Sequence, residues 1–306
     1  MNAIVTKGLT KKFGEFIAVN NIDLEVGNGE IFGFLGANGA GKTTTIKMLV
    51  GLLPPTSGSI FVSGIDVVKQ PLKIRETIGY MSQKFSLYND LTVEENIDFF
   101  AGIYGIAFKK AKQLKEELIE RFQLQEFRKF LTKDLPLGLK QRLALGVALM
   151  HKPKVIFLDE PTSGADPIAR KYFWELIQSL ANDGVTCFVT THYLEEAEFC
   201  SRISLIDSGK IIACGSPNEL KRKYFQTPIF EVDFGNLEKN IEVYRKGVSN
   251  SEISFFGSRL HITMKELSVS ENDLRIQLTS TFGEQPRTIR RILPTLEDVF
   301  IKAIQK

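Results

Sequence analysis

Residues 36–43 read Gly-Ala-Asn-Gly-Ala-Gly-Lys-Thr and match the phosphate-binding pattern G-x-x-x-x-G-K-[ST]. Its glycines let the backbone curl so that successive N–H groups point at an anion, and a following helix adds its positive end. Lys42 would supply charge to the outer phosphates, and Thr43 a hydroxyl ligand for Mg²⁺. A glycine-rich turn that only caps a helix is the simpler alternative. The residues expected to hold phosphate are Gly36, Ala37, Asn38, Gly39, Ala40, Gly41, Lys42, Thr43 and Thr44.

A pair of acidic residues is predicted to lie near this loop. Four apolar residues, 155–158, precede Asp159 and Glu160. This pattern predicts a central strand that delivers two carboxylates to the edge of an α/β sheet where ligands bind. Asp159 would hold Mg²⁺, directly or through water, and Glu160 would act as general base on an attacking water. Two solvated acids at the end of a buried strand are the alternative.

The flanking segments supply the context that the phosphate-binding pattern requires. Residues 30–35 form a short apolar run that is typical of a buried strand, and residues 44–53 favour a helix that ends before Pro54. Strand, glycine loop and helix together predict that the chain binds a nucleoside triphosphate.

Alternating strand and helix patterns extend along the chain. Strands are expected at residues 3–9, 22–26, 31–35, 59–62, 155–158, 185–189, 203–206 and 210–213. Helical periodicity is expected at residues 93–104, 109–122, 139–150 and 168–182. After the basic run at 221–223, further strands are expected at residues 229–234, 253–256, 260–264 and 274–278. This order predicts a mainly parallel α/β core, a helical insertion and a small C-terminal α/β domain.

Composition and charge limit the classes of protein to which this chain can belong. The chain has 306 residues, 43% hydrophobic and 25% charged, which suits one large soluble domain and a smaller one. A net charge of +3 gives little support for binding nucleic acid or an anionic membrane. Three cysteines without metal-ligand spacing indicate reduced thiols. No leader-like segment or apolar run of membrane-spanning length is found, so we expect a cytoplasmic protein; if it acts at a membrane, another chain must bring it there.

Two runs of residues resemble the ATP-binding subunits of ABC transporters: Glu-Pro-Thr-Ser-Gly-Ala-Asp-Pro at 160–167 and Thr-Thr-His at 190–192. The resemblance covers residues 3–220. It implies an ABC-type P-loop ATPase domain at 1–220, with a helical subdomain at about 84–152, and an accessory domain at 221–306. It also implies ATP and Mg²⁺ as ligands.

The resemblance assigns roles to four further residues. Phe13 matches the aromatic residue that stacks on adenine, and Gln83 matches the glutamine that contacts Mg²⁺ and the attacking water. Asp166 matches the aspartate of a loop that crosses to a second subunit, and His192 the histidine that contacts the γ-phosphate. Taken singly, each has a structural alternative, such as a strand-end aromatic for Phe13 or a core histidine for His192.

The signature segment of that family, usually Leu-Ser-Gly-Gly-Gln, departs from the pattern. Pro136 replaces the serine, Leu137 replaces the first glycine, and Gly138 is retained. Loss of a hydrogen bond from the serine hydroxyl to phosphate costs about 1.5–3 kcal/mol, or roughly ten- to a hundredfold in the step that it serves. A proline suits the first turn of a helix, so the N–H of Gly138 and the helix end remain available to phosphate. We therefore expect an altered but competent site rather than an inactive one.

The C-terminal run 296–301, Leu-Glu-Asp-Val-Phe-Ile, resembles ATPases of multidrug and daunorubicin-resistance exporters. A plain amphipathic helix is the alternative. The implied function is ATP hydrolysis by a nucleotide-sandwich dimer, homodimeric or heterodimeric, that powers export through a separate transmembrane subunit docked near residues 84–96. The alternative for residues 84–96 is packing within the helical insertion.

Two other classes of P-loop protein fit the sequence less well. A non-transport ABC ATPase acting on ribosomes or nucleic acid usually carries two cassettes or a long coiled-coil insertion, and this chain has one phosphate-binding loop. A P-loop kinase or GTPase lacks support because no Asn-Lys-x-Asp occurs. The basic clusters at 221–223 and at Arg287, Arg290 and Arg291 are interpreted as solvated surface, and no nucleic-acid partner is expected.

Overall fold

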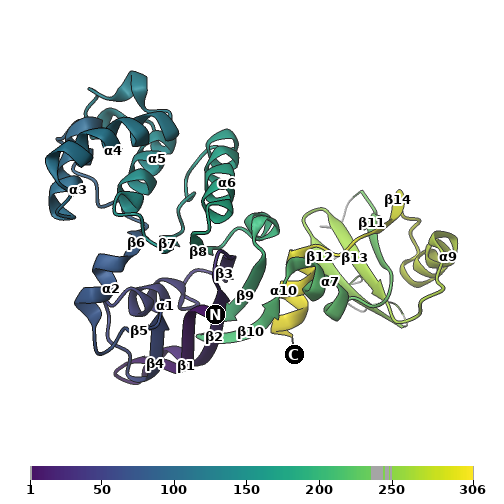
Figure 1. The fold of residues 1–306 in the computed structure, drawn as a ribbon. Coiled ribbons are helices and arrows are strands. Elements are labelled where there is room, and N and C mark those ends of the chain that lie inside the picture. Colours follow the sequence, from purple (N-terminus) through teal and green to yellow (C-terminus); the bar gives the residue numbers. More distant parts are fainter. Residues whose placement is uncertain (1, 236–243, 245–247, 249, 306) are drawn as a thin grey trace. The chain divides into compact units, whose positions relative to one another are not determined.

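Apolar strands separated by helices build two sheets in the first 216 residues and a third sheet in the remainder. The structure, a computed structural model, describes residues 2–235, 244, 248 and 250–305. The chain divides into two compact units, Met1–Ser216 and Pro217–Lys306 (Figure 1). Each unit has its own sheet and helices, which confirms the predicted fold class of an α/β core with a helical insertion and a smaller C-terminal α/β part.

The main sheet of the first unit brings three candidate segments to one edge. Its strand order is β10-β9-β3-β8-β7-β6, and all neighbours are parallel except β9 and β10. Because β3, β8 and β7 are adjacent and parallel, the segments that follow them meet at the same edge. The strands are β3 (Ile31–Leu35), β6 (Ile78–Met81), β7 (Val155–Asp159), β8 (Thr186–Thr191), β9 (Arg202–Asp207) and β10 (Lys210–Gly215).

Aromatic side chains fill the centre of this sheet. The ring of Phe188 on β8 lies 5.7 Å from that of Phe32, 5.6 Å from that of Phe34 and 5.6 Å from that of Phe157. All four residues are fully buried. Strands covered on both faces need continuous apolar runs, which β3 and β7 have. This packing fixes the edge at which the polar residues lie.

An antiparallel sheet completes the core of the first unit. Its strand order is β2-β1-β4-β5, and the tip of the β1–β2 hairpin pairs Phe13 with Phe16. The strands are β1 (Asn2–Phe13), β2 (Phe16–Gly27), β4 (Ser57–Val62) and β5 (Ile65–Asp66).

Helices surround the sheets and form the insertion. Figure 1 shows α3, α4 and α5 grouped together, apart from the antiparallel strands. The α-helices of this unit are α1 (Lys42–Leu49), α2 (Pro71–Thr77), α3 (Val93–Ile103), α4 (Phe108–Arg121), α5 (Leu137–Leu149) and α6 (Pro167–Asn182). Short 3₁₀ segments are η1 (Gln125–Phe127), η2 (Thr132–Asp134) and η3 (Leu194–Phe199). Among the described residues, no helix has the length and apolar character needed to cross a membrane.

A buried asparagine organises the segment before α3. The side-chain amide of Asn96 donates to the carbonyls of Tyr88 and Leu91 and to Thr132 Oγ1, and its oxygen accepts from the backbone N–H of Tyr88. Asn96 is fully buried, whereas Tyr88 is half exposed. Residues 88–92 therefore form a turn anchored by the first turn of α3 rather than a free loop.

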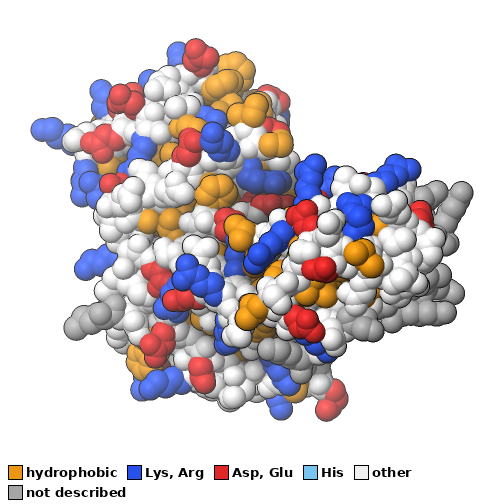
Figure 2. Space-filling view, turned by 90° about the vertical axis from the view of Figure 1, so that its right-hand side faces the viewer, with side chains coloured by type: hydrophobic (Ala, Val, Ile, Leu, Met, Phe, Trp, Pro, Cys, Tyr) orange, Lys and Arg blue, Asp and Glu red, His pale blue; other side chains and the backbone are white. Residues whose placement is uncertain are grey.

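The second unit contains a four-stranded antiparallel sheet of order β12-β13-β11-β14. Its strands are β11 (Ile229–Asp233), β12 (Ser251–Phe256), β13 (Arg259–Met264) and β14 (Thr288–Ile292). Its described helices are α7 (Pro217–Tyr224), α9 (Glu271–Phe282) and α10 (Leu296–Ile304). The face in Figure 2 shows Lys and Arg side chains interspersed with Asp and Glu rather than gathered in one field.

The strand predicted at residues 274–278 is wrong, because this segment lies inside α9. Ser270 and Asp273 form a capping box at the start of the helix, and Gly283 ends it with a φ of 70°. Leu274 and Leu278, four residues apart, are both buried. This spacing places them on one helical face, and the cap outweighs the strand-like local composition.

The motif at 296–301 forms the start of α10 and is tied to the sheet by a buried pair. Asp298 Oδ1 lies 2.7 Å from His261 Nδ1 on β13, and its Oδ2 accepts hydrogen bonds from Thr295. Burial alone would raise the pKa of Asp298, but these bonds from His261 and Thr295 outweigh it and lower the pKa. Asp298 therefore joins the terminal helix to the sheet.

Candidate functional site

The loop between β3 and α1 takes a shape that requires glycine. A Cβ at Gly36 would lie 2.2 Å from the carbonyl oxygen of Ile206, and Gly41 has a φ of 109°. No larger residue fits the first position, and L-residues rarely adopt the second conformation. The loop therefore reaches the amino end of α1 in the form that lets backbone N–H groups face an anion.

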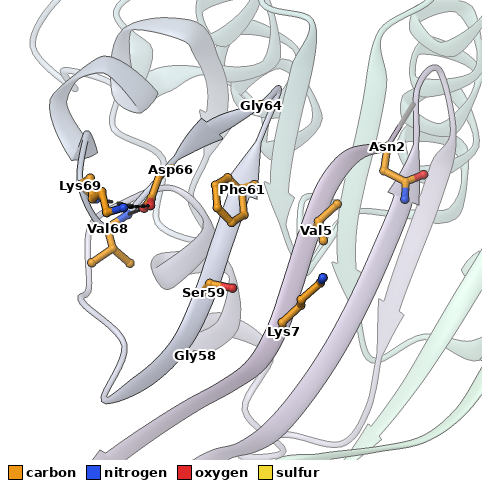
Figure 3. Close-up of a pocket in the computed structure, with 10 residues that line it drawn as sticks. All are labelled: Asn2, Val5, Lys7, Gly58, Ser59, Phe61, Gly64, Asp66, Val68 and Lys69. Atoms are coloured by element: carbon orange, nitrogen blue, oxygen red, sulfur yellow. Dashed lines mark hydrogen bonds and ion pairs between the residues drawn. The ribbon is translucent and has the colours of Figure 1, made fainter.

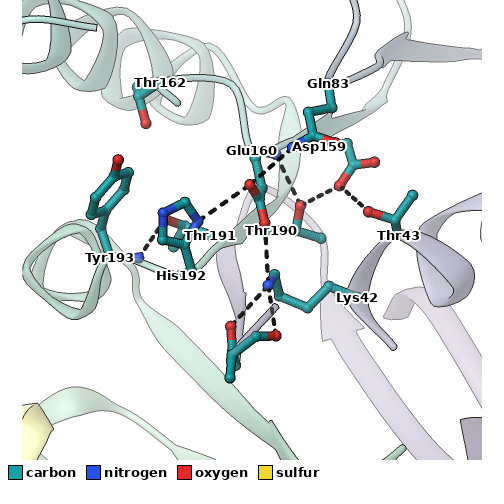
Figure 4. Close-up of polar contacts among 12 residues, drawn as sticks. Lys42, Thr43, Gln83, Asp159, Glu160, Thr162, Thr190, Thr191, His192 and Tyr193 are labelled. Atoms are coloured by element: carbon teal, nitrogen blue, oxygen red, sulfur yellow. Dashed lines mark hydrogen bonds and ion pairs between the residues drawn. The ribbon is translucent and has the colours of Figure 1, made fainter. Parts of the chain in front are cut away.

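Lys42 is held at the centre of the site. Its ammonium donates to the carbonyls of Gly36 at 2.8 Å and Ala37 at 3.2 Å, and lies 3.2 Å from Glu160 Oε1 (Figure 4). The residue is 4% exposed, so its charge is confined to this point of the cavity. A fixed, poorly solvated cation is suited to binding phosphate oxygens.

Asp159 is buried at the end of β7, between two hydroxyl groups. Its Oδ1 accepts hydrogen bonds from Thr190 at 2.7 Å and from Thr43 at 3.2 Å. Burial raises the pKa of this carboxyl, while the hydrogen bonds from Thr190 and Thr43 oppose that shift. The carboxylate thus lies directly beside the hydroxyl predicted to bind a metal.

Glu160 occupies the point where several elements converge. Its φ is 48°, an uncommon value for a non-glycine residue, and its N–H donates to Thr190. Figure 4 shows its carboxylate between three side chains. Glu160 Oε2 lies 3.3 Å from Gln83 Nε2 and 3.2 Å from His192 Nδ1, while Oε1 faces Lys42.

The residues beside the phosphate-binding loop fit a magnesium ion that also binds phosphate. Thr43 and Asp159 present hard oxygen atoms, and Gln83 reaches the neighbouring carboxylate. Within the described ranges, no group of three or more His, Cys, Asp or Glu side chains forms a metal cage. Mg²⁺ is usually held by one or two carboxylates with phosphate and water, so a complete protein cage is not required.

A cavity of about 660 Å³ joins most of these residues, whereas Asp159 lies behind Thr43 and is not in the lining. It is lined by Phe16, Ala18, Asn38, Gly39, Gly41, Lys42, Thr43, Thr44, Gln83, Glu160, Ser163 and His192. Phe13 is not in this lining; it is 50% exposed, and the centroid of its ring lies 5.2 Å from the Nζ atom of Lys11 on β1. Phe16, its hairpin partner, lines the cavity directly.

Asp166 and the segment 136–138 lie away from this cavity. The carboxylate of Asp166 caps α6 by accepting hydrogen bonds from the N–H groups of Ile168 and Ala169, both at 3.0 Å. Pro136 is the residue before α5, where its side chain makes no capping hydrogen bond. These residues are therefore not part of the cavity formed by their own chain.

The segment 136–138 instead packs beside α6 and the loop before it. A Cβ at Gly164 would lie 3.2 Å from Leu137 Cδ2, and a Cβ at Gly138 would lie 2.9 Å from the Cβ of Ala169. Leu137 remains 37% exposed. The N-terminus of α5 is thus supported by Leu137 and Gly138 while part of it faces outward.

A second cavity, of about 730 Å³, lies on the antiparallel sheet and has different chemistry (Figure 3). It is lined by Val5, Phe61 and Val68 together with Lys7 and an Asp66–Lys69 ion pair. None of the phosphate-binding residues lines it. We therefore place the candidate site in the smaller cavity, where the charged groups converge.

The sequence did not predict Phe16, Ala18, Ser163 and Thr190 as contributors to the site. Ser163 belongs to the run 160–167, and Thr190 ends the strand next to Asp159. A hydroxyl at the carboxyl end of an adjacent buried strand is a signal that would have found Thr190. Phe16 depends on the hairpin register, which has no comparable local signal.

Comparison with known proteins places this arrangement in a family. Residues 19–163 match the family described as ABC transporter. The Probable multidrug ABC transporter ATP-binding protein YbhF of Escherichia coli (strain K12) is 52% identical over 218 residues, which are 71% of this chain and 38% of that relative. The chain thus spans well under half the length of YbhF.

Other similarities cover more of the matched protein. The Linearmycin resistance ATP-binding protein LnrL of Bacillus subtilis (strain 168) is 35% identical, over 91% of this chain and 86% of LnrL. A dimeric structure of the ATP-binding cassette MJ0796, in a post-hydrolysis state with ADP and Pi, is similar with a TM-score of 0.64 and 27% identity. That match covers 70% of this chain and 98% of that cassette. The predicted resemblance is confirmed, and this chain belongs to the family of ABC transporter ATP-binding proteins.

Proposed function

We propose that this chain hydrolyses ATP and that the hydrolysis powers export through a separate transmembrane subunit. The observation that carries the proposal is the convergence of Lys42, Gln83 and His192 on the carboxylate of Glu160. Asp159 and Thr43 lie at the same edge of the sheet. A cation for phosphate and a base line one cavity, and the metal-binding pair lies at its edge, where Asp159 contacts the cavity-lining Thr43. Phosphoryl transfer to water requires these groups.

Binding is assigned to the phosphate-binding loop and its neighbours. Backbone N–H groups of the loop hold the phosphates, and Lys42 neutralises their outer charge. The adenine ring is assigned to the hairpin tip, where Phe13 and Phe16 each offer an aromatic face. Mg²⁺, held by Thr43 and Asp159 with Gln83 nearby, supplies positive charge to the outer phosphate oxygens when bound.

Hydrolysis is assigned to Glu160 as general base. The oxygen of a water molecule bonds to the γ-phosphorus, the bond from that phosphorus to the ADP oxygen breaks, and Glu160 receives a proton from the water. Gln83 is assigned to orient the water, and His192 to contact the γ-phosphate. Both side chains already contact the carboxylate, so base and orienting groups are arranged before substrate binds.

The remaining wall of the site is assigned to a second subunit. Pro136, Leu137 and Gly138 lie outside the cavity of their own chain, and the exposed start of α5 offers N–H groups and a positive helix end. We propose that this segment closes over the nucleotide held by a partner cassette. Asp166, at the start of α6, would lie at the same interface.

Transport is assigned to a docking surface at residues 84–96. Tyr88 is 48% exposed, its ring packs on Phe99 at 4.4 Å, and Asn96 anchors the turn beneath it. An exposed aromatic on an anchored turn suits a short helix of a membrane partner on the cytoplasmic face. The names of YbhF and LnrL, which refer to multidrug transport and linearmycin resistance, support export rather than a role on ribosomes or nucleic acid.

The test is ATP hydrolysis by the purified chain, with the Glu160→Gln variant as the blank. We expect Mg²⁺-dependent release of phosphate from the wild type and none above background from the variant. Co-expression with a polytopic membrane protein encoded beside this chain should yield a complex in detergent. Absence of hydrolysis would overturn the enzymatic part, whereas sedimentation with ribosomes instead of membranes would overturn the transport part.

A further inference from the structure

Glu196, in η3, is a buried carboxylate outside the catalytic cluster. It is 1% exposed. Its Oε1 accepts a hydrogen bond of 2.5 Å from Thr162 Oγ1 and lies 3.5 Å from Arg170 Nε. Its Oε2 has no hydrogen-bond partner among the described residues. Leaving a buried carboxylate oxygen without a hydrogen bond costs free energy. The contacts of the other oxygen, Oε1, should therefore serve a purpose that outweighs this cost.

The first contact leads to the loop that carries Glu160. Thr162 is 1% exposed and lies two residues after Glu160. The N–H of Ser163 donates to the carbonyl of Glu160, and the N–H of Ala165 donates to that of Thr162. Two consecutive turns therefore connect the backbone of Glu160 to the residue that Glu196 holds.

The second contact leads to His192. The guanidinium of Arg170, on α6, lies 4.2 Å from the ring centroid of Tyr193. The Tyr193 ring in turn lies 4.1 Å from the ring of His192, whose Nδ1 faces Glu160. Figure 4 shows Tyr193 beside His192 and Thr162 at the end of the loop from Glu160.

We propose that Glu196 is a positioning residue that keeps the side chains of Glu160 and His192 in fixed positions relative to each other. This inference rests on the proposed function, in which those two residues act on the γ-phosphate. Through Thr162 the carboxylate fixes the loop of the base, and through Arg170 and Tyr193 it fixes the ring of His192. The same loop continues to Asp166, so any shift of that loop at a subunit interface would move both Glu160 and His192.

The consequence is a specific loss of turnover. Thr162 and Arg170, the side chains that Glu196 contacts, do not line the phosphate-binding cavity, so removing its charge should leave ATP affinity nearly intact. Displacement of Glu160 and His192 by a fraction of an ångström should lower the rate of hydrolysis. A residue that only stabilised the fold would instead lower melting temperature and ATP binding together.

The experiment compares Glu196→Gln with Glu195→Gln. Glu195 is the preceding residue of η3 and is exposed, so its variant is a matched loss of one charge. We expect Glu196→Gln to lower kcat about tenfold, equivalent to about 1.4 kcal/mol in the barrier, with the Kd for ATP changed less than about twofold. Glu195→Gln should match the wild type in both measurements.

A double-mutant cycle with Thr162→Val tests the connection itself. Thr162→Val removes the hydroxyl at nearly constant volume, and its loss in kcat should be contained in that of Glu196→Gln rather than added to it. Melting curves for every variant separate misfolding from misalignment. If Glu196→Gln folds poorly, Thr162→Val still tests the connection, and an unchanged kcat in that variant would overturn the inference.

The outcomes separate this inference from the function on which it rests. An active wild type with Glu196→Gln equal to Glu195→Gln would overturn the positioning role alone. Parallel losses of kcat and ATP affinity, or strictly additive effects with Thr162→Val, would also overturn it. A wild type no more active than Glu160→Gln would overturn the proposed function, and the inference with it.

Discussion

The phosphate-binding edge of the sheet and the segment 136–138 differ in how their functional groups are held. At the sheet edge, Lys42, Asp159 and Glu160 each have partners within the chain at 2.7–3.3 Å. At the segment 136–138, Pro136 makes no side-chain capping bond and Leu137 is 37% exposed. At the sheet edge, side chains hold the functional groups in place, whereas the segment 136–138 presents backbone N–H groups and the N-terminus of a helix.

This difference suggests how the two regions depend on other chains. A network of buried side chains is preorganised, so its chemistry is available once a nucleotide binds. A helix N-terminus attracts phosphate weakly and only within its first turn, so the segment 136–138 depends on being brought close by a partner. Substitutions at the sheet edge should therefore have larger effects than substitutions in the segment.

The largest effect is expected for Glu160→Gln. Removal of a general base typically costs 10²–10⁴-fold, so kcat should fall by about that factor while ATP still binds. Single-turnover phosphate release and nucleotide binding measure the two quantities. Glu195→Gln is the matched control, and retention of more than about a tenth of the activity would assign the base to another residue.

Lys42→Met should have the next largest effect, and on binding rather than turnover alone. Loss of a charge-assisted hydrogen bond costs about 1.5–3 kcal/mol, so the Kd for ATP should rise roughly ten- to a hundredfold. Calorimetric titration with ATP measures this change. Lys47→Met, an exposed lysine on the same helix, should bind as the wild type does, and equal losses in both variants would contradict a specific phosphate contact.

A smaller effect is expected at the hairpin tip. Phe16→Leu should weaken ATP binding about two- to tenfold, because an aromatic stacking contact contributes about 0.5–1.5 kcal/mol. Binding of inorganic triphosphate should not change. An equal loss in Phe13→Leu would support the stacking predicted from sequence, and unchanged affinity in both variants would contradict an aromatic adenine contact at this tip.

The sequence predicted the sheet edge well because its signals are local or periodic. Strand, loop and helix around Lys42 are contiguous, and Asp159 follows its strand directly. Parallel strands then bring their ends together without further information. The contact of Glu196 with Thr162 spans 34 residues and has no local pattern. The register that places Phe16 in the cavity is likewise set by pairing between strands.

The wrong strand at 274–278 shows the opposite limit. Leu274 and Leu278 fit one face of a helix, but five residues are too few to separate helical from strand periodicity. The deciding signals were the capping pair Ser270 and Asp273 and the terminal Gly283. Reading the ends of the segment before its interior would have given the helix.

The smallest effect is expected where the sequence departs most from its family, at Pro136 and Leu137. If the site lacks a hydrogen bond that a serine would supply, Pro136→Ser with Leu137→Gly should raise ATPase activity about ten- to a hundredfold. We expect unchanged or lower activity, because Pro136 and Leu137 at the start of α5 are already exposed and Leu137 packs beside Gly164. Serine is a good N-cap whereas glycine within a helix costs about 1 kcal/mol, so melting temperature is measured beside kcat to separate stability from turnover.

Pro136→Ala is the control that removes proline without adding a hydroxyl. A large gain in the serine–glycine variant alone would show that the segment is deficient, and the contrast between the two regions would then be one of lost function rather than of a different way of holding phosphate.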